Sequence, residues 1–265
     1  MPQTIADGLR LRYDVAGVGE PALLFLHGWC DNRTQFHRLV PVCAQKRRVL
    51  AVDLPGHGSS QAPRGDFGLR EVVGAAAAVI EASGADRIVP VAMAHSGWVA
   101  IALRRRLGAA RLPKLVLLDW MVLEPPRPFL EALQSLQDPE RWKSARAQLF
   151  ALWRADADTS IAAHIHRTMG DFGSGMWARA GREIAAAYAR EGSPLRALSA
   201  LDPSTPTLHL YSLPKDEAYR EAQEFFAKSH PWFRARRLDG KTHFPALETP
   251  DAVAAAIEEF LAAEA

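Results

Sequence analysis

The sequence lacks the features of a disulfide-rich, metal-binding or membrane-spanning protein. It contains only two cysteines, Cys30 and Cys43, and this pair offers neither a disulfide framework nor the spacing of a metal site. No stretch approaches the roughly 18 consecutive apolar residues of a membrane span. Residues 1–14 contain no apolar segment of the kind found in a secretory signal. We therefore expect a cytoplasmic protein without a membrane span.

The sequence also has no concentration of charge of one sign. Its 32 lysines and arginines nearly balance 30 aspartates and glutamates, so the formal net charge is +2. Short basic runs such as 104–106 and 236–237 are far apart, which is typical of solvated helix faces rather than of a nucleic-acid-binding stripe. This distribution predicts no nucleic-acid partner, and it favours no particular oligomeric state.

What the sequence does contain is an alternation of buried strands and helices. With 265 residues and 48% hydrophobic content, the chain is long enough for one large α/β domain with an insertion. Strands alternating with helices predict a mostly parallel sheet flanked by helices, with functional groups at the carboxyl ends of the strands. The expected strands are Leu9–Val15, Ala22–Leu26, Arg48–Val52, Ile88–Val91, Leu115–Leu118, Thr207–Tyr211 and Phe233–Leu238. The expected helices include Leu69–Ser83, Val99–Leu103, Glu217–Lys228 and Asp251–Ala263.

The alternation is interrupted by a segment with helical periodicity only. Prolines mark both of its ends, at 125, 126 and 128 on one side and at 194 and 203 on the other. Aromatic residues and methionines are distributed through it. We expect residues 124–201 to form a helical cap over a core made of residues 1–123 and 202–265.

The stretch Ile88–Trp98, IVPVAMAHSGW, is typical of a nucleophile elbow, in which a strand ends in a tight turn and a helix follows. The residues two before and two after the apex must be small, because bulky ones clash in so sharp a turn. With Ser96 at the apex one of these positions is Trp98, which is too large. With Ala94 at the apex they are Ala92 and Ser96, and both fit. The sequence therefore predicts an elbow whose apex carries no nucleophile.

Functional side chains follow four of the expected strands. They are His27-Gly28-Trp29, Ala94-His95, Asp119 and His243. The order of elbow, acid and histidine is that of an α/β-hydrolase triad, so this pattern predicts the α/β-hydrolase fold. The glycine-rich turn at 53–60 supports the same fold, and we expect His57 to be structural, with a hydrogen bond inside that turn.

Without a nucleophile, the predicted site remains able to remove a proton. His243 backed by Asp119 is a general base, since the carboxylate selects the tautomer and favours the imidazolium. The main-chain N–H groups of Trp29 and His95 are expected to form an oxyanion pocket. Acyl-enzyme chemistry would require Ser96, which the spacing of small residues disfavours. The missing hydroxyl at Ala94 leaves a methyl-sized space where a substrate can approach the base.

Two other groups have simpler interpretations. His164 and His166 are two residues apart on a helix, so they face different directions, and no third ligand is close in sequence. We therefore predict no metal site and assign them surface or cap contacts. Cys30, next to the oxyanion turn, is interpreted as a packing residue.

Beyond these patterns, the chain resembles the cofactor-independent 3-hydroxy-4(1H)-quinolone 2,4-dioxygenases, a group with the α/β-hydrolase fold. The resemblance covers nearly the whole chain, and its most specific part is the cap, which general hydrolases do not share. The segments that carry it are His27-Gly28-Trp29-Cys30, His95-Ser96-Gly97-Trp98-Val99, Asp119-Trp120, Asp138-Pro139-Glu140-Arg141-Trp142, Leu149-Phe150-Ala151-Leu152-Trp153, Gly192-Ser193-Pro194-Leu195, His230-Pro231-Trp232-Phe233 and Thr242-His243-Phe244-Pro245.

The resemblance implies cleavage of an aromatic heterocycle by O2, with release of carbon monoxide and an N-acylanthranilate. It implies a small-molecule quinolone substrate, O2 as co-substrate, and neither a metal nor an organic cofactor. By the same resemblance, His243 with Asp119 takes the 3-hydroxyl proton, and the substrate anion reacts with O2. His95 holds the C4 carbonyl and Trp153 flanks the ring.

Two positions depart from the family members that act on short-chain substrates. Those members carry serine where this chain has Ala94, and histidine or glutamine where it has Asp31. Ala94 resembles the subgroup that acts on 2-alkyl-3-hydroxy-4(1H)-quinolones with long tails, a class that includes bacterial quorum signals. An apolar set in the cap is expected to line an alkyl tunnel or to form ordinary cap core: Phe129, Leu130, Leu133, Leu136, Phe150, Met169, Met176 and Trp177.

Two alternative hypotheses accompany the dioxygenase. The first is an esterase-like hydrolase that uses Ser96, or that has lost a serine at position 94. The second is a non-catalytic relative that only binds a ligand in the former hydrolase pocket. Retention of Asp119 together with His243 argues against the second, because a binding protein has no need of a general base.

Overall fold

The computed structural model describes residues 3–6, 8–154 and 157–263 of the chain. In these residues eight strands form one sheet in the order β1-β2-β4-β3-β5-β6-β7-β8. The first three neighbours in this order, β1, β2 and β4, are joined antiparallel, and all other pairs are parallel. The strands are β1 (Gln3–Ala6), β2 (Leu9–Ala16), β3 (Ala22–Leu26), β4 (Val49–Val52), β5 (Ile88–Met93), β6 (Leu115–Leu118), β7 (Thr207–Tyr211) and β8 (Phe233–Arg237).

The predicted, mostly parallel sheet is confirmed by the strand pairing. Its central strands are continuous apolar runs, which explains their position in the middle of the sheet. Every residue of β3, β4, β5 and β6 is buried, as expected for strands covered on both faces. Strand β1 was not predicted. Its four residues are at most half-buried, and so short a segment at a sheet edge carries no strong apolar pattern.

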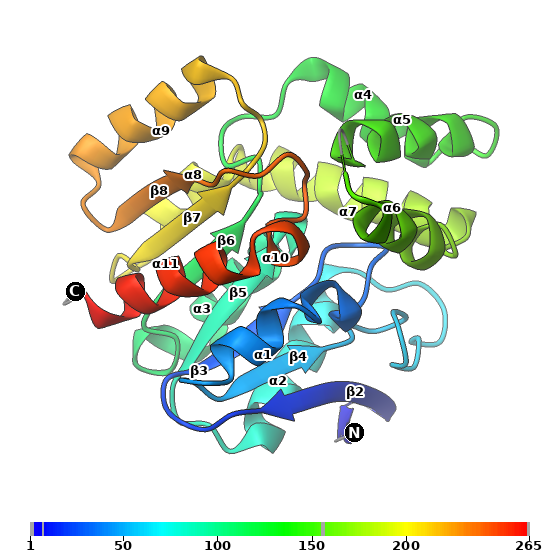
Figure 1. Ribbon diagram of the computed structural model, residues 1–265. Helices are drawn as coiled ribbons and strands as arrows, with labels where there is room; N and C mark the ends of the chain where they lie inside the picture. The colour runs from blue at the N-terminus through cyan, green and yellow to red at the C-terminus, as the bar shows by residue number, and fades with distance from the viewer. Residues whose placement is uncertain (1–2, 7, 155–156, 264–265) are drawn as a thin grey trace.

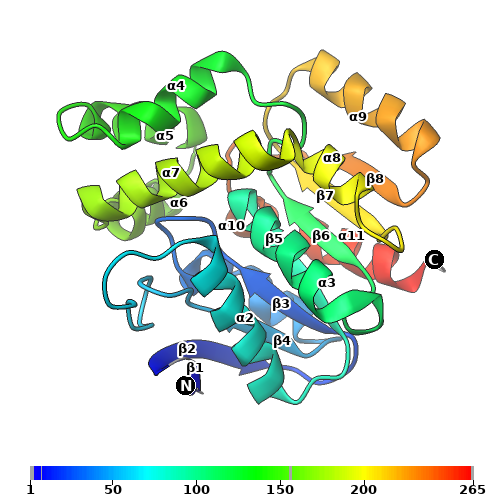
Figure 2. The ribbon, with the colours of Figure 1, turned by 180° about the vertical axis from the view of Figure 1, so that it is seen from behind.

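Helices cover both faces of the sheet. Helices α1 and α11 lie in front of it in Figure 1, and α2 and α3 cover the opposite face in Figure 2. The core is accordingly divided into two buried hydrophobic clusters, one on each face of the sheet. The helices outside residues 124–201 are η1 (Arg33–Phe36), α1 (Leu39–Cys43), α2 (Leu69–Ser83), η2 (Ala94–Ser96), α3 (Gly97–Arg111), α9 (Glu217–Ser229), α10 (Pro245–Glu248) and α11 (Pro250–Ala262).

The described residues between 124 and 201 contain helices and no strand. In Figure 1 most of these helices lie together at the upper right, beyond one end of the sheet. They are α4 (Arg127–Leu136), α5 (Trp142–Arg154), α6 (Thr159–His164), η3 (Ile165–Met169), α7 (Ser174–Glu191) and α8 (Pro194–Ser199). None of the helices in the described part of the chain has the length and apolar character that crossing a bilayer requires.

Candidate active site

Three strands of the sheet are followed by residues with strained backbone. Among the described residues other than glycine, only Cys30, Ala94 and Asp119 have positive φ, with values of 57°, 47° and 45°. Such a conformation costs of order 1–3 kcal/mol and is concentrated at functional sites. All three follow the carboxyl ends of neighbouring parallel strands, β3, β5 and β6. The strain therefore gathers at the edge of the sheet where an α/β protein places its site.

Ala94 occupies the apex of the predicted elbow. Its backbone turns sharply between β5 and α3, and Gly97 packs so closely on Trp120 that an added Cβ would lie 2.1 Å from the indole ring. Ser96 is 2% exposed, and its hydroxyl donates a hydrogen bond to the carbonyl oxygen of His27. Ser96 therefore faces away from the site, which removes it as a nucleophile.

His243 and Asp119 form a hydrogen-bonded pair. His243 Nδ1 lies 3.0 Å from Asp119 Oδ1, and Asp119 Oδ2 accepts a hydrogen bond of 2.8 Å from the main-chain N–H of Ser212. The carboxylate thus holds Nδ1 as a donor and leaves Nε2 as the basic nitrogen. Sequence reasoning missed Ser212, because a main-chain donor gives no sequence signal.

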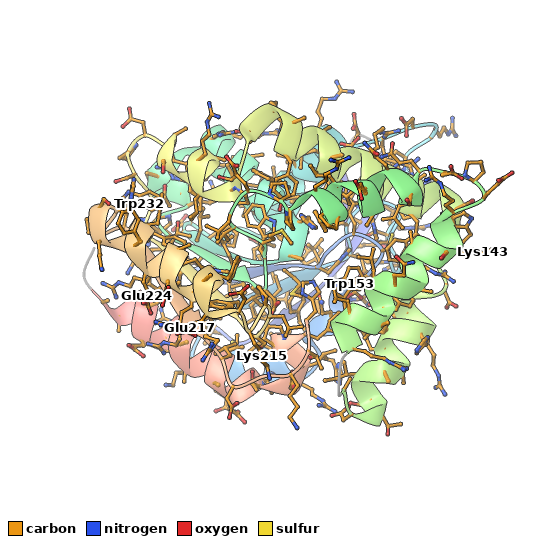
Figure 3. The ribbon with its side chains drawn as sticks, turned by 90° about the horizontal axis from the view of Figure 1, so that it is seen from above. Lys143, Trp153, Lys215, Glu217, Glu224 and Trp232 are labelled. Carbon is orange, nitrogen blue, oxygen red and sulfur yellow. The ribbon has the colours of Figure 1, made fainter. Side chains whose placement is uncertain are left out.

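Trp153 orients the His243 imidazole from the helical segment. The two rings are stacked, with centroids 5.3 Å apart and an interplanar angle of 21°. The main-chain N–H of His243 also donates to the Trp153 carbonyl oxygen over 3.0 Å. In Figure 3, Trp153 lies near the middle of the molecule, whereas Lys143 of the same helix lies at the outer edge.

His95 is a neutral imidazole whose proton position is determined by Trp120. The Trp120 indole N–H lies 3.2 Å from His95 Nδ1, which therefore acts as the acceptor and leaves the proton on Nε2. Burial, together with the nearby His243, lowers the pKa of His95 to about 3. His95 also stacks on Phe129 at 5.5 Å. His95 is thus equipped to donate one hydrogen bond from Nε2.

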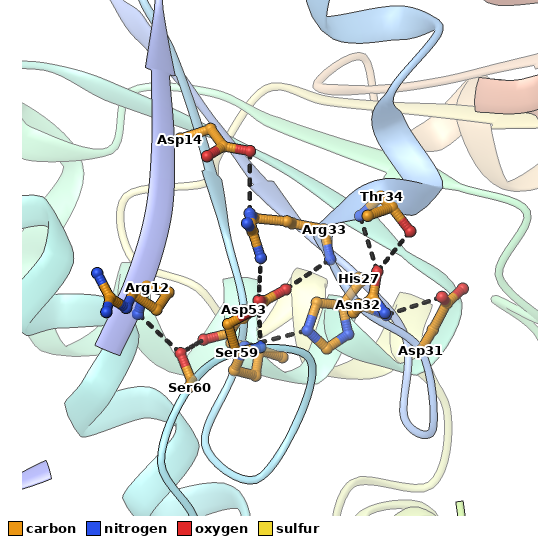
Figure 4. Close-up of polar contacts among 11 residues, drawn as sticks. Arg12, Asp14, His27, Asp31, Asn32, Arg33, Thr34, Asp53, Ser59 and Ser60 are labelled. Carbon is orange, nitrogen blue, oxygen red and sulfur yellow. Dashed lines mark hydrogen bonds and ion pairs between the residues drawn. The ribbon is translucent and has the colours of Figure 1, made fainter. Parts of the chain in front are cut away.

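The turn after β3 is anchored to the turn after β4 by polar contacts (Figure 4). Arg33 pairs with both Asp14 and Asp53, and His27 Nε2 accepts a 3.0 Å hydrogen bond from the main-chain N–H of Leu54. In this part of the structure, the turn hydrogen bonds include none donated by the main-chain N–H of Trp29. Trp29 itself lines the cavity described below.

His57 is structural, as predicted. Its Nδ1 lies 2.8 Å from the Pro55 carbonyl oxygen within the turn. Its Nε2 also accepts a 3.2 Å hydrogen bond from the Cys30 N–H, a contact that the sequence did not reveal. Burial lowers the pKa of His57 to about 3. Cys30 is fully buried, which agrees with its predicted packing role and raises the pKa of its thiol.

A cavity of about 500 Å³ brings the predicted site residues together. Its walls include all six of them: Trp29, Ala94, His95, Asp119, Trp153 and His243. Five of the apolar residues proposed for an alkyl tunnel also line it, namely Phe129, Leu133, Leu136, Met169 and Trp177. Leu130, Phe150 and Met176 do not line it.

The chain matches the model of the "Alpha/beta hydrolase family" over residues 23–256. The chain belongs to the alpha/beta hydrolase family. Structures related only distantly share this fold, such as a thermophilic esterase from Thermogutta terrifontis, at 22% identity and a TM-score of 0.75. The predicted fold class is confirmed.

Within this family the chain belongs with the 3-hydroxy-4-quinolone dioxygenases. It is 39% identical to the "2-heptyl-3-hydroxy-4-quinolone dioxygenase AqdC2" of Rhodococcus erythropolis, with 96% of each chain covered. It is 38% identical to the "1H-3-hydroxy-4-oxoquinoline 2,4-dioxygenase" of Pseudomonas putida, covering 97% of this chain and 98% of that one. A solved structure of an AqdC variant in complex with its substrate, the Pseudomonas quinolone signal, aligns with a TM-score of 0.94 at 36% identity, over 98% of both chains.

Several residues of this hydrolase-fold site were not predicted. The cavity wall also includes Gln35, Met93, Ile184 and Phe244. Phe244 follows His243 directly, which was the available signal for it. Met93 directly precedes Ala94, so it carried the same signal. Ile184 and Gln35 are separated in sequence from every predicted site residue, so only the folded chain reveals their position.

The two histidines of the helical segment contact neighbouring side chains, His164 from a half-buried position and His166 from an exposed one. His164 Nε2 lies 2.9 Å from Asp31 Oδ1, and the ring of His166 meets the edge of Phe150 at 5.9 Å. Among the described residues, no group of three or more His, Cys, Asp or Glu side chains is arranged to hold a metal ion. The contact to Asp31 links the helical segment to the turn after β3.

Proposed function

We propose that this protein is a cofactor-free dioxygenase that cleaves the heterocyclic ring of 2-alkyl-3-hydroxy-4(1H)-quinolones. The observation that carries the proposal is the pairing of a general base, His243 with Asp119, and a neutral donor, His95, in one cavity whose elbow apex is Ala94. Relatives with 38–39% identity over nearly the full chain are dioxygenases of 3-hydroxy-4-quinolones, and two of these three are named for the 2-heptyl compound, which supports the assignment.

The first step in this proposal is removal of the 3-hydroxyl proton. His243 Nε2 takes the proton, and Asp119 stabilises the resulting imidazolium through Nδ1. The negative charge of the anion is shared between the 3-oxygen and C2, and His95 donates from Nε2 to the neighbouring C4 carbonyl oxygen. The N–H groups of Trp29 and His95 contribute further donors at the same edge.

The second step is the reaction of this electron-rich anion with O2. The oxygen molecule bonds to C2 and forms a peroxide, which closes on C4. Cleavage of the O–O bond and of the bonds from C3 to C2 and C4 then releases C3 as carbon monoxide. Both oxygen atoms of O2 remain in the N-acylanthranilate, one in the new acyl group and one in the carboxylate. The anion itself supplies the electrons, so we propose neither a metal nor an organic cofactor.

We also propose that residues 124–201 act as a cap that covers the substrate and houses its alkyl tail. The apolar side chains that α4 and α7 contribute to the cavity support this role, because an alkyl chain gains free energy at about 0.8 kcal/mol per buried CH₂ group. We expect tails of several carbons to be preferred over a methyl group.

The test is to supply purified, chelator-treated protein with 2-heptyl-3-hydroxy-4(1H)-quinolone and to measure O2 uptake and carbon monoxide release together. We expect both in equal amounts, with faster turnover at low concentration for the heptyl than for the methyl substrate. With ¹⁸O₂, the label should enter the acyl oxygen and the carboxylate but not the carbon monoxide. Absence of O2 uptake would refute the proposal.

The hydrolase alternative has little support in the structure. Ser96 is buried and its hydroxyl donates a hydrogen bond to the His27 carbonyl oxygen, and Ala94 has no hydroxyl. The binding-protein alternative predicts quinolone binding without turnover, which the carbon monoxide measurement distinguishes from the dioxygenase.

A further inference from the structure

Two buried acceptor atoms in the cavity wall have no partner within the described chain. Asp31 and Gln35 are each 1% exposed, and both line the cavity. Asp31 Oδ2 and Gln35 Oε1 accept no hydrogen bond from a described residue. Leaving a buried acceptor unpaired is costly. Two such atoms in one substrate cavity therefore indicate that a ligand supplies a donor.

The main chain of the turn that carries the two acceptors is held in place, and so is the carboxylate of Asp31. The other carboxylate oxygen, Asp31 Oδ1, accepts a 2.7 Å hydrogen bond from the Asn32 N–H and lies 2.9 Å from His164 Nε2. The main-chain N–H of Gln35 donates to the Asn32 carbonyl oxygen over 3.1 Å. Arg33 fastens the same turn to Asp53 (Figure 4). The site is thus positioned before a ligand arrives, which reduces the entropic cost of binding.

We propose that Asp31 and Gln35 form an acceptor subsite that receives a hydrogen-bond donor of the ligand, and that they determine specificity for donor-bearing quinolones. This inference rests on the proposed function. In that reaction the 3-hydroxyl goes to His243 and the C4 oxygen to His95, so the ring N–H is the donor that remains on the parent substrate. A hydroxyl on the carbocyclic ring is the second source of the same chemistry.

The subsite distinguishes a quinolone from its oxygen analogue. A 3-hydroxychromen-4-one has the same outline, but a ring oxygen replaces the N–H group. That oxygen offers no hydrogen to Asp31, and two acceptors facing each other repel. Because a hydrogen bond to a charged group is stronger than a neutral one, we expect a preference for the quinolone of about 10- to 100-fold.

The test is equilibrium binding without O2, so that no turnover occurs. The full-length protein is titrated with 2-heptyl-3-hydroxy-4(1H)-quinolone, its chromenone analogue, and a quinolone with one carbocyclic hydroxyl. In the wild type the quinolone should bind more tightly than the chromenone, or the hydroxylated compound more tightly than the parent. In Asp31→Leu the corresponding ratio should fall to within about threefold of unity, and Asp31→Asn, which keeps an acceptor, should retain part of it.

Gln35→Met provides an independent test in case the Asp31 variants do not fold. It should reduce the same ratio, whereas Gln45→Met, a change of the same type outside the cavity, should leave it unchanged. Equal affinities of the wild type for all three compounds would overturn the inference, and so would ratios unchanged in Asp31→Leu and Gln35→Met. If the wild type still releases carbon monoxide in air, the proposed function holds even though this inference fails. A wild type that binds none of the compounds and releases no carbon monoxide refutes both.

Discussion

At the scale of single residues, the site depends on which nitrogen of each histidine carries a proton. Asp119 keeps the His243 proton on Nδ1, and the Trp120 indole keeps the His95 proton on Nε2. One histidine therefore presents a basic nitrogen to the cavity, and the other presents a donor. We therefore propose opposite roles for two residues of the same type, because their hydrogen-bond partners differ.

Replacement of the base tests this division directly. His243→Ala should lower turnover by about 10²- to 10⁴-fold, since general-base catalysis is worth that much. Asp119→Asn introduces a residue that also tolerates positive φ. We expect its loss of turnover to be about tenfold smaller than that of His243→Ala if the substrate hydroxyl is already acidic. His166→Ala, which alters a histidine outside the cavity, should turn over like the wild type. Near-normal turnover in His243→Ala would show that another group is the base.

The elbow apex offers a second test at this scale. Ala94→Ser introduces a hydroxyl into the cavity that His243 also lines, where we expect it to compete for Nε2. We expect dioxygenase turnover within about tenfold of the wild type and no efficient hydrolysis of p-nitrophenyl esters. The measurement is a parallel assay of carbon monoxide release and p-nitrophenol release. Efficient ester turnover would contradict the view that the cavity is suited to proton removal.

At the scale of elements, the elbow depends on how closely α3 packs on Trp120. The Trp120 ring occupies the space that any side chain at Gly97 would need, and Trp98 meets the same ring edge-on at 4.8 Å. The position of α3 and the orientation of the indole that serves His95 are therefore coupled. A change in this packing affects stability and His95 together.

Gly97→Ala measures this packing. Its Cβ would lie 2.1 Å from the Trp120 ring, so we expect a loss of about 1–3 kcal/mol in the free energy of unfolding, as for other overpacked sites. Gly175→Ala is the matched control, because its Cβ would meet nothing within 4 Å. It should be neutral or stabilising by up to about 1 kcal/mol. Urea unfolding of both variants provides the comparison, and equal stabilities would show that Trp120 yields at little cost.

At the scale of the whole molecule, buried histidines link folding to pH. Burial lowers the pKa of His57 and His95 to about 3 and that of His209 to about 4, from a usual value of 6.5. Between pH 6.5 and 4 the unfolded chain binds protons at these positions and the native protein does not. The free energy of unfolding therefore decreases as the pH falls through this window.

The expected slope is about 1.4 kcal/mol per pH unit for each such histidine. Denaturant unfolding at a series of pH values between 7 and 4 measures it. His209→Gln should reduce this slope by about 1.4 kcal/mol per pH unit, whatever its effect on overall stability. His37→Gln, at an exposed histidine, is the control for the substitution itself. A slope that stays the same in His209→Gln would show that this histidine is protonated in the native state.

Local patterns sufficed to predict most of the fold. The strands Ala22–Leu26, Leu115–Leu118 and Thr207–Tyr211 have the predicted bounds, because continuous apolar runs between turn residues identify buried strands. The helix Leu69–Ser83 also has its predicted bounds, since Gly84 ends it at a φ of 66°. The strand Gln3–Ala6 and the short helices after β3 were not predicted, because their sequences carry no regular period.

The sequence by itself determined where most of the strands lie along the chain, the empty apex at Ala94 and the residue types that follow each strand. These features depend on neighbours along the chain, so a linear pattern is enough to recognise them. The tertiary structure decided which groups meet. His243 reaches Asp119 across 124 positions, the Trp120 indole selects the His95 tautomer, and burial of Asp31 and Gln35 leaves two acceptors for a ligand. Proton positions and burial arise from contacts between distant segments, so they exist only in the folded chain.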